Sequence, residues 1–304
     1  MEEILSLMPP LLRAEIHSAL EQRADIHEIR LRKGKPIVLC AADKTFFIRN
    51  GQPVQVYEPS VAVADTETVE TVFAALSHYS LYTYQDNLNE GFITLKGGGR
   101  VGVCATAVVK NGVVCSVKDI SALNFRVARQ VHDTAAMPIL ERLYARDLPS
   151  TVIIGAPMSG KTTLLREICK VLSSGFHGRY YKCCVIDERG EIAAMHGGTA
   201  EFDVGINTDV LSFFPKKQGI LNAVRTLAPD VIIADELGDK SECESILQGF
   251  HSGVKFFLSM HAVDMEDARK KEQFRVLEQS GNFGAAVCLE NGGEPGSVKE
   301  WHFL

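Results

Sequence analysis

A phosphate-binding loop is the clearest chemical signal in the sequence. Residues 155–162 read Gly-Ala-Pro-Met-Ser-Gly-Lys-Thr and match the pattern G-x-x-x-x-G-K-[ST] at every fixed position. An apolar strand expected over residues 151–154 runs into this loop, and a helix expected over residues 162–172 leaves it. In this setting the backbone N–H groups and the helix dipole attract phosphate, so a chance glycine turn is a poor alternative.

The loop predicts ATP as the bound nucleotide, with Mg²⁺ beside it. Lys161 is expected to contact the β- and γ-phosphates, and the Thr162 hydroxyl is expected to bind Mg²⁺. The residues expected to bind the nucleotide are Gly155, Ala156, Pro157, Met158, Ser159, Gly160, Lys161, Thr162 and Thr163.

Two carboxylates after another apolar strand predict a second part of the same site. The strand is expected over residues 230–235, and Asp235 and Glu236 stand where it leaves the sheet. The carboxyl ends of strands form the ligand crevice of open α/β sheets. Asp235 is therefore expected to hold Mg²⁺ through water, and Glu236 to orient or deprotonate the attacking water. A solvated strand end is the alternative, and the phosphate loop in the same domain argues against it.

An acidic segment follows a third apolar strand. Residues 187–191 read Asp-Glu-Arg-Gly-Glu, directly after the strand expected over residues 181–187. This segment is either an exposed loop or a set in which Glu188 or Glu191 shares the γ-phosphate region with Glu236. The residues alone do not choose between Glu188 and Glu191.

A single histidine ends the strand expected over residues 254–260. A lone histidine is more often structural than functional. His261, however, stands at the carboxyl end of a strand, where a γ-phosphate sensor belongs. We therefore add His261 to the expected catalytic residues.

The elements that must position these residues change character near residue 150. From Thr151 onward, apolar strands alternate with helices, which is typical of a largely parallel sheet covered on both faces. The helices are expected over residues 162–172, 219–227, 241–251 and 265–278. The predicted fold class is α/β, a RecA-like P-loop NTPase domain with a mainly parallel sheet.

The first half of the chain predicts a smaller α+β domain. We expect an amphipathic helix within residues 1–23 that starts near Pro9-Pro10, and a helix over residues 66–77 capped by Asp65. Short strands are expected within residues 27–50, 91–117 and 124–128, followed by a helical connector over residues 139–145. The predicted domains are residues 1–148 and residues 149–304.

Composition and charge exclude several other classes of protein. With 46% hydrophobic and 23% charged residues, the chain is not a disordered one. The first 150 residues hold 16 basic and 17 acidic side chains, leaving 16 and 21 for the rest. This even, mildly acidic balance disfavours binding to a phosphate backbone, so no nucleic-acid partner is expected.

Targeting signals and cysteines indicate a cytoplasmic location. No segment reaches the roughly 18 apolar residues of a membrane-spanning helix, and the N-terminus lacks the apolar run of a signal peptide. The eight cysteines are scattered and mostly lie in apolar runs, which indicates buried free thiols rather than disulfides.

The order of these motifs resembles the secretion-ATPase superfamily, which contains the hexameric motors of type II and type IV secretion and of pilus assembly. More closely, the chain is similar to the sporulation ATPases of endospore-forming bacteria. The segments that carry this closer likeness are 28–32, 91–98, 123–128, 160–167, 186–189, 208–211 and 215–216. The resemblance implies a homo-hexameric, ATP-hydrolysing motor of a sporulation-specific, secretion-like membrane complex. Such a motor would be peripheral and held at the membrane by membrane proteins.

The resemblance also implies a role for two arginines of the first domain. In secretion ATPases this domain supplies arginines to the nucleotide of the assembled ring, and Arg100 and Arg126 match those two places. An arginine near a developing phosphoryl charge is a recurrent catalytic device. Surface arginines at the edge of a strand are the alternative.

Four positions depart from the family pattern. The family usually has histidine where Gly99 stands, arginine where Asn207 stands, and glycine where Met158 and Ala262 stand. Met158 matters most, because a side chain there restricts a loop whose backbone must approach phosphate closely.

Two other functions share part of the pattern. A nucleic-acid-dependent RecA-like ATPase would need a basic groove with aromatic side chains, which the even charge and the single tryptophan, Trp301, do not favour. A scaffold that binds ATP in order to assemble, with negligible turnover, is the second alternative.

Overall fold

The computed structural model divides the chain into two compact units, Met1–Arg129 and Gln130–Leu304. It describes residues 2–23, 25–41, 44–78, 88–89, 91–95, 99–110, 112–126, 135–238, 240–291 and 296–304. The division comes before the one expected between residues 148 and 149, because the expected connector, α5 (Ala136–Tyr144), packs its apolar side into the core of the second unit. Residues 96–98 and 111 of the segment expected over 91–117, and residues 127–128 of the segment expected over 124–128, lie outside the described residues.

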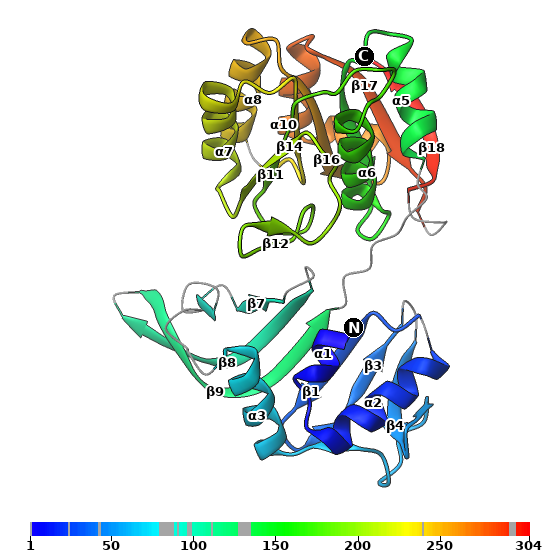
Figure 1. Cartoon of the computed structure of the whole chain (residues 1–304), viewed down its shortest axis with the longest axis vertical. Helices are drawn as coiled ribbons and strands as arrows, with labels where there is room; N and C mark the ends of the chain where they lie inside the picture. The colour runs from blue at the N-terminus through cyan, green and yellow to red at the C-terminus, as the bar shows by residue number, and fades with distance from the viewer. Residues whose placement is uncertain are drawn as a thin grey trace. The chain divides into compact units, whose positions relative to one another are not determined.

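The first unit is built on an antiparallel sheet with the strand order β5-β4-β3-β1-β9-β8-β7 (Figure 1). Its core lies on one face of this sheet, where apolar side chains of the helices meet those of alternate strand residues. The elements of this unit are α1 (Glu2–Ser6), α2 (Pro10–Gln22), β1 (Glu28–Arg32), β2 (Lys35–Pro36), β3 (Val38–Cys40), β4 (Thr45–Arg49), β5 (Gln52–Val54), β6 (Val63–Ala64), α3 (Thr66–Leu76), β7 (Phe92–Thr94), β8 (Arg100–Lys110) and β9 (Val113–Arg126).

Two helix starts follow from local sequence signals. Pro10 begins α2, as expected for a residue that lacks an N–H and is tolerated in a first turn. Asp65 caps α3, and its side chain accepts a hydrogen bond from the Thr68 N–H at 2.8 Å. Both starts lie where the sequence predicts them.

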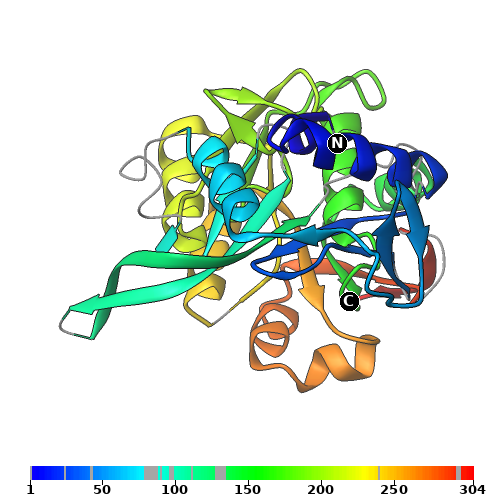
Figure 2. The same cartoon turned by 90° about the horizontal axis from the view of Figure 1, so that it is seen from below.

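The hairpin of the first unit is longer than the sequence indicates. Short strands were expected within residues 91–117 and, separately, within residues 124–128, but residues 113–126 form one strand, β9, that pairs with β8 along its length. The strand β9 has more residues than β8. The register is irregular between Cys104 and Thr106 and between Val108 and Val109, and these irregularities accommodate the extra residues. The result is a long ribbon whose far end extends beyond the neighbouring strands of its sheet (Figure 2).

The second unit contains the predicted, mainly parallel sheet, with the strand order β14-β11-β15-β16-β10-β17-β18. Only the β17–β18 pair is antiparallel among the described strands of this sheet. The elements after α5 are β10 (Ser150–Gly155), α6 (Lys161–Ser173), β11 (Cys183–Asp187), β12 (Met195–His196), β13 (Thr199–Ala200), β14 (Thr208–Ser212), α7 (Lys216–Asn222), a π-helical turn (Ala223–Leu227), β15 (Val231–Ala234), α8 (Lys240–His251), β16 (Lys255–His261), α9 (Met265–Lys270), α10 (Glu272–Gln279), β17 (Phe283–Leu289) and β18 (Val298–Phe303).

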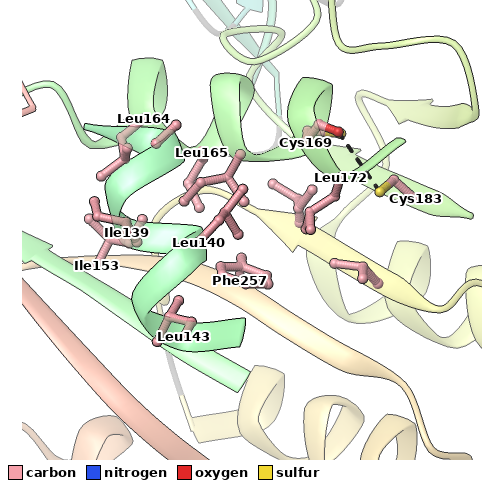
Figure 3. Packing of buried hydrophobic residues seen from close by; sticks show 14 of the residues in the cluster. Ile139, Leu140, Leu143, Ile153, Leu164, Leu165, Cys169, Leu172, Cys183 and Phe257 are labelled. Atoms are coloured by element: carbon pink, nitrogen blue, oxygen red, sulfur yellow. Dashed lines mark hydrogen bonds between the residues drawn. The ribbon is translucent and has the colours of Figure 1, made fainter. Parts of the chain in front are cut away.

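Helices cover both faces of this sheet, as predicted. On one face, side chains of α5 and α6 such as Leu140 and Leu165 pack against Ile153 and Phe257 of the strands (Figure 3). On the other face, residues of α7, α8 and α10, among them Ile220, pack against the opposite side chains of the same strands. The central strands are therefore buried on both sides, which explains their continuous apolar sequences.

Both edge strands of this sheet, the strand β17 beside one of them, and one helix break were not predicted from the sequence. The strands β14, β17 and β18 were not predicted, and the helix expected over residues 265–278 is split into α9 and α10 at Lys271. Lys271 has an extended backbone (φ −83°, ψ 130°), and its ammonium donates to the His261 carbonyl. The helices of the described part of the chain are each too short or too polar to cross a lipid bilayer.

Candidate nucleotide-binding and hydrolysis site

The carboxyl ends of three neighbouring strands bring the predicted site residues together. The strands β15, β16 and β10 are parallel and adjacent. Gly155 at the end of β10 lies opposite His261 at the end of β16, and Asp235 directly follows β15. Residues that are far apart in sequence therefore meet at one edge of the sheet.

Lys161 begins α6, and its side chain folds back onto the loop. Its Nζ donates to the carbonyl oxygens of Gly155 at 2.9 Å and Ala156 at 2.8 Å, and it lies 3.0 Å from His261 Nδ1. Because a lysine ammonium can only donate, Nδ1 is the acceptor of this bond. Burial lowers the pKa of Lys161, and the nearby carboxylates of Asp235 and Glu236 act in the opposite direction.

A chain of hydrogen bonds joins the start of α6 to the end of β15. The Thr162 hydroxyl donates to Asp235 Oδ2 at 2.6 Å. The other carboxylate oxygen of Asp235 accepts from the Ser259 hydroxyl and, at 2.9 Å, from the Glu236 N–H. Mg²⁺ prefers oxygen donors and keeps several waters, so a hydroxyl and a carboxylate side by side at the loop fit this ion. No pattern in the sequence marks Ser259, a lone hydroxyl in an apolar strand.

Glu236 lies between a guanidinium and an imidazole. Its carboxylate pairs with Arg189, and its Oε1 is 3.6 Å from His261 Nε2. Its backbone has φ +41°, a left-handed conformation that costs a residue other than glycine about 1–3 kcal/mol. Hydrogen bonds from its N–H to Asp235 and Ser259 help to maintain this conformation, which turns the side chain out of the strand.

A buried lysine connects the acidic segment to Glu236. Lys216 is only 4% exposed, and its ammonium donates to the Glu236 carbonyl and lies 3.3 Å from Glu242 Oε2. The Glu188 carboxylate accepts from the Lys216 N–H at 3.1 Å, and its second oxygen lies 3.6 Å from Nζ. No role for Lys216 was predicted from the sequence. The available signal was a basic residue in the first turn of α7, where the helix dipole disfavours positive charge.

Asp187 and Arg166 hold the acidic segment by its backbone. The Asp187 carboxylate accepts from the N–H groups of Glu191, Ile192 and Ala193 at 2.8–3.1 Å. The buried Arg166 of α6 donates to the carbonyl oxygens of Glu191 and Ile192 at 2.7 and 2.6 Å. Glu191 thus helps to fix the loop through its backbone, whereas Glu188 is connected to Glu236 through Lys216.

The loop itself has the shape that its glycines require. A Cβ on Gly155 would come within 2.3 Å of Ser159 Oγ, and Gly160 has φ +91°, so glycine is needed at both positions. Met158 has φ +66° as well, and its side chain is 76% exposed, so the departure from glycine strains the backbone without filling the loop. The buried Ser159 Oγ has no hydrogen-bond partner among the described residues. A hydrogen bond to a phosphate oxygen would satisfy this hydroxyl.

The two predicted arginines of the first unit lie side by side. Arg100 and Arg126 are directly opposite each other across β8 and β9, and both strands are interior strands of their sheet. Like charges in this arrangement repel each other, so an anion between them would be stabilising. On the same face, the buried Asn124 Oδ1 and Thr94 Oγ1 have no hydrogen-bond partner within the described residues.

Comparison with known proteins connects this site to a family. The family described as "Sporulation stage III, protein AA" matches residues 1–302. Stage III sporulation protein AA of Bacillus subtilis (strain 168) is 33% identical over 302 residues, which is 99% of this chain and 94% of that protein. The chain belongs to the stage III sporulation protein AA family. The likeness to a sporulation protein family predicted from the motifs is confirmed.

Solved structures show that the chain shares its fold with the pilus retraction motor PilT and the ATPase DotB. The pilus retraction motor PilT, solved with bound ADP, superposes with a TM-score of 0.59 at 15% identity, over 94% of this chain and 80% of that one. The ATPase DotB of Legionella pneumophila superposes with a TM-score of 0.58 at 15% identity, over 91% and 75%. The predicted α/β fold class is therefore confirmed.

Proposed function

We propose that the chain is an ATP-binding and ATP-hydrolysing motor subunit. One observation carries this proposal: Lys161, the hydrogen-bonded pair Thr162–Asp235, and Glu236 meet at the carboxyl ends of adjacent parallel strands. A phosphate-binding lysine, a magnesium-binding pair and a carboxylate that can prepare water are the parts that phosphoryl transfer to water requires.

Each side chain of the site has a separate role in hydrolysis. Lys161 exchanges the loop carbonyls for phosphate oxygens when ATP binds, and Thr162, with Asp235 through water, holds Mg²⁺, which neutralises phosphate charge when it is bound. Glu236 orients the attacking water and accepts its proton. His261 contacts both Lys161 and Glu236, which suits a group that senses the γ-phosphate. Glu188 supports this set through Lys216.

We further propose that this motor lies in the cytoplasm of an endospore-forming bacterium. There it serves a sporulation-specific, secretion-like membrane complex. Membership of the AA family and the fold shared with DotB and PilT support this assignment. The working form would be a homo-hexamer that docks on membrane proteins of the complex through its N-terminal domain.

Phosphate release by the purified full-length chain tests the enzyme activity. We expect ATP hydrolysis that needs Mg²⁺ and stops with EDTA, and oligomers in mass photometry with ATP and Mg²⁺. Negligible phosphate release would favour the assembly scaffold, and strong stimulation by single-stranded DNA would favour the nucleic-acid-dependent ATPase. Monomers alone at micromolar protein would contradict the hexamer.

Arg100 and Arg126 are proposed to reach the nucleotide of a neighbouring subunit. Because a charge-assisted hydrogen bond contributes about 1.5–3 kcal/mol, Arg100→Ala and Arg126→Ala should each lower kcat at least about tenfold. Arg49→Ala, which removes a surface partner of Glu58, is the matched control and should leave kcat unchanged.

Mixing two impaired variants tests whether the arginines act between subunits. Arg126→Ala keeps an intact loop, and Lys161→Ala keeps an intact arginine. A mixture should therefore regain part of the hydrolysis that each lacks alone. Unmodified rates in both arginine variants would remove these residues from the site.

A further inference from the structure

The antiparallel pair β17–β18 brings together three side chains that can bind a metal ion. Cys288 of β17 lies directly opposite Glu300 of β18, and His302 is two residues further along β18. Residues two apart on a strand point to the same face. One ligand atom from each of the three, a sulfur, a carboxylate oxygen and a ring nitrogen, lies within 4.8 Å of the others.

His302 is held close to Glu300 without being bonded to it. Its buried Nε2 is 3.2 Å from Glu300 Oε2, yet this nitrogen has no hydrogen-bond partner among the described residues. A buried polar atom without a partner is costly, so it calls for an explanation. The separation resembles the roughly 3.3 Å expected between two ligands that each lie about 2.0–2.1 Å from a tetrahedral ion.

One side of this three-residue cluster is buried, and the other side is open to solvent. Cys288 is fully buried, and on its other flank it pairs with Ile154 of β10 within the apolar core. The side chains of Glu300 and His302 are about one-third exposed. The three ligands therefore leave a route by which an ion, and a water as its fourth ligand, can enter.

We propose that Cys288, Glu300 and His302 bind a transition-metal ion of the Zn²⁺ class. A thiolate, an imidazole and a carboxylate select Zn²⁺ or Co²⁺ over Mg²⁺ and Ca²⁺, which prefer oxygen donors alone. On binding, the Sγ–H bond of Cys288 breaks, the proton goes to solvent, and an Sγ–metal bond forms. No oxidation or reduction takes place.

The pair that carries these ligands also reaches the phosphate loop. Beyond β17, Asn291 accepts a hydrogen bond from the Ala156 N–H at 3.3 Å, and before β18 the Gly296 N–H donates to the Ser159 carbonyl at 2.8 Å. An ion that bridges β17 and β18 therefore stabilises the base of a connection that contacts the nucleotide-binding residues. The proposal itself does not depend on ATP hydrolysis.

Cobalt spectroscopy of the full-length chain tests this site. The protein is stripped with a chelator and titrated with Co²⁺ without nucleotide. We expect one equivalent to produce thiolate-to-cobalt absorption in the near ultraviolet and tetrahedral bands in the visible, both abolished by Zn²⁺. The oxygen ligands Thr162 and Asp235 cannot produce the thiolate band.

Substitutions identify the ligands. Cys288→Ser should abolish the near-ultraviolet band, and His302→Gln and Glu300→Gln should each weaken Co²⁺ binding at least tenfold with an unchanged circular dichroism spectrum. Cys104→Ser and His196→Gln remove an exposed thiol and an exposed imidazole elsewhere and should change nothing.

Three outcomes would overturn the proposal. They are a missing thiolate band in the unmodified chain, a band that survives Cys288→Ser, and unchanged Co²⁺ affinity in His302→Gln. The two substitutions on β18 also provide a test if Cys288→Ser fails to fold.

Discussion

Glu236→Gln is expected to lower the rate of ATP hydrolysis by about 10²–10⁴-fold, the range that a general base contributes. Glutamine keeps the shape of the side chain but cannot accept the proton of the attacking water at neutral pH. The hydrogen bonds of the Glu236 backbone to Asp235, Ser259 and Lys216 do not involve its carboxylate, so the local structure should persist. ATP should remain bound because Lys161 and the loop are unchanged.

Single-turnover phosphate release and binding of a fluorescent ATP analogue separate these two effects. Glu266→Gln is the matched control, because Glu266 is an exposed residue of α9 whose carboxylate pairs with Lys270 at 3.1 Å. Its hydrolysis rate should equal that of the unmodified chain. A Glu236→Gln protein that hydrolyses ATP within threefold of the unmodified rate would exclude Glu236 as the base.

Lys161→Ala is expected to weaken ATP binding roughly ten- to hundredfold, because a hydrogen bond to a charged group contributes about 1.5–3 kcal/mol. The side chain is 5% exposed and already held beside the loop by the Gly155 and Ala156 carbonyls, so it is poised where the phosphates would lie. Removal of the ammonium also leaves these carbonyls without their donor. A lower melting temperature should therefore accompany the loss of affinity.

Lys170→Ala provides a control on the same helix. Lys170 pairs with Asp203 at 2.9 Å near the other end of α6, so its loss removes one positive charge without altering the loop. Its affinity for the analogue, measured by fluorescence titration, should equal that of the unmodified chain. Equal affinity in Lys161→Ala, with the fold intact by circular dichroism, would contradict the predicted binding of phosphate by Lys161.

Signals that act over a few residues predicted much of the second unit. The strand β10, the loop and α6 follow one another as the motif requires, because glycine conformations and the helix N-terminus are set locally. The apolar sequences of β11, β15 and β16 predicted strands because these strands are buried on both faces. The edge strands β14 and β18 are only partly buried, and their mixed sequences gave no clear pattern.

The acidic segment illustrates what a local pattern leaves open. Its acids looked alike in sequence, but Asp187 binds backbone N–H groups of its own loop, and Glu188 pairs with Lys216. Lys216 is 28 residues from Glu188 and 20 from Glu236, so no short motif includes all three. The role of such a lysine follows only from the packing of α7 against the sheet.

The sequence by itself determined the phosphate loop, the alternation of strands and helices, and the family likeness, because each depends on neighbouring residues or on the order of motifs. The tertiary structure decided which distant side chains meet: His261 with Lys161, Arg189 with Glu236, Ser259 with Asp235, and Cys288 with Glu300 and His302. These contacts depend on the order and register of strands that are far apart in the sequence. The local pattern of a single sequence does not specify which distant strands pair, or in which register.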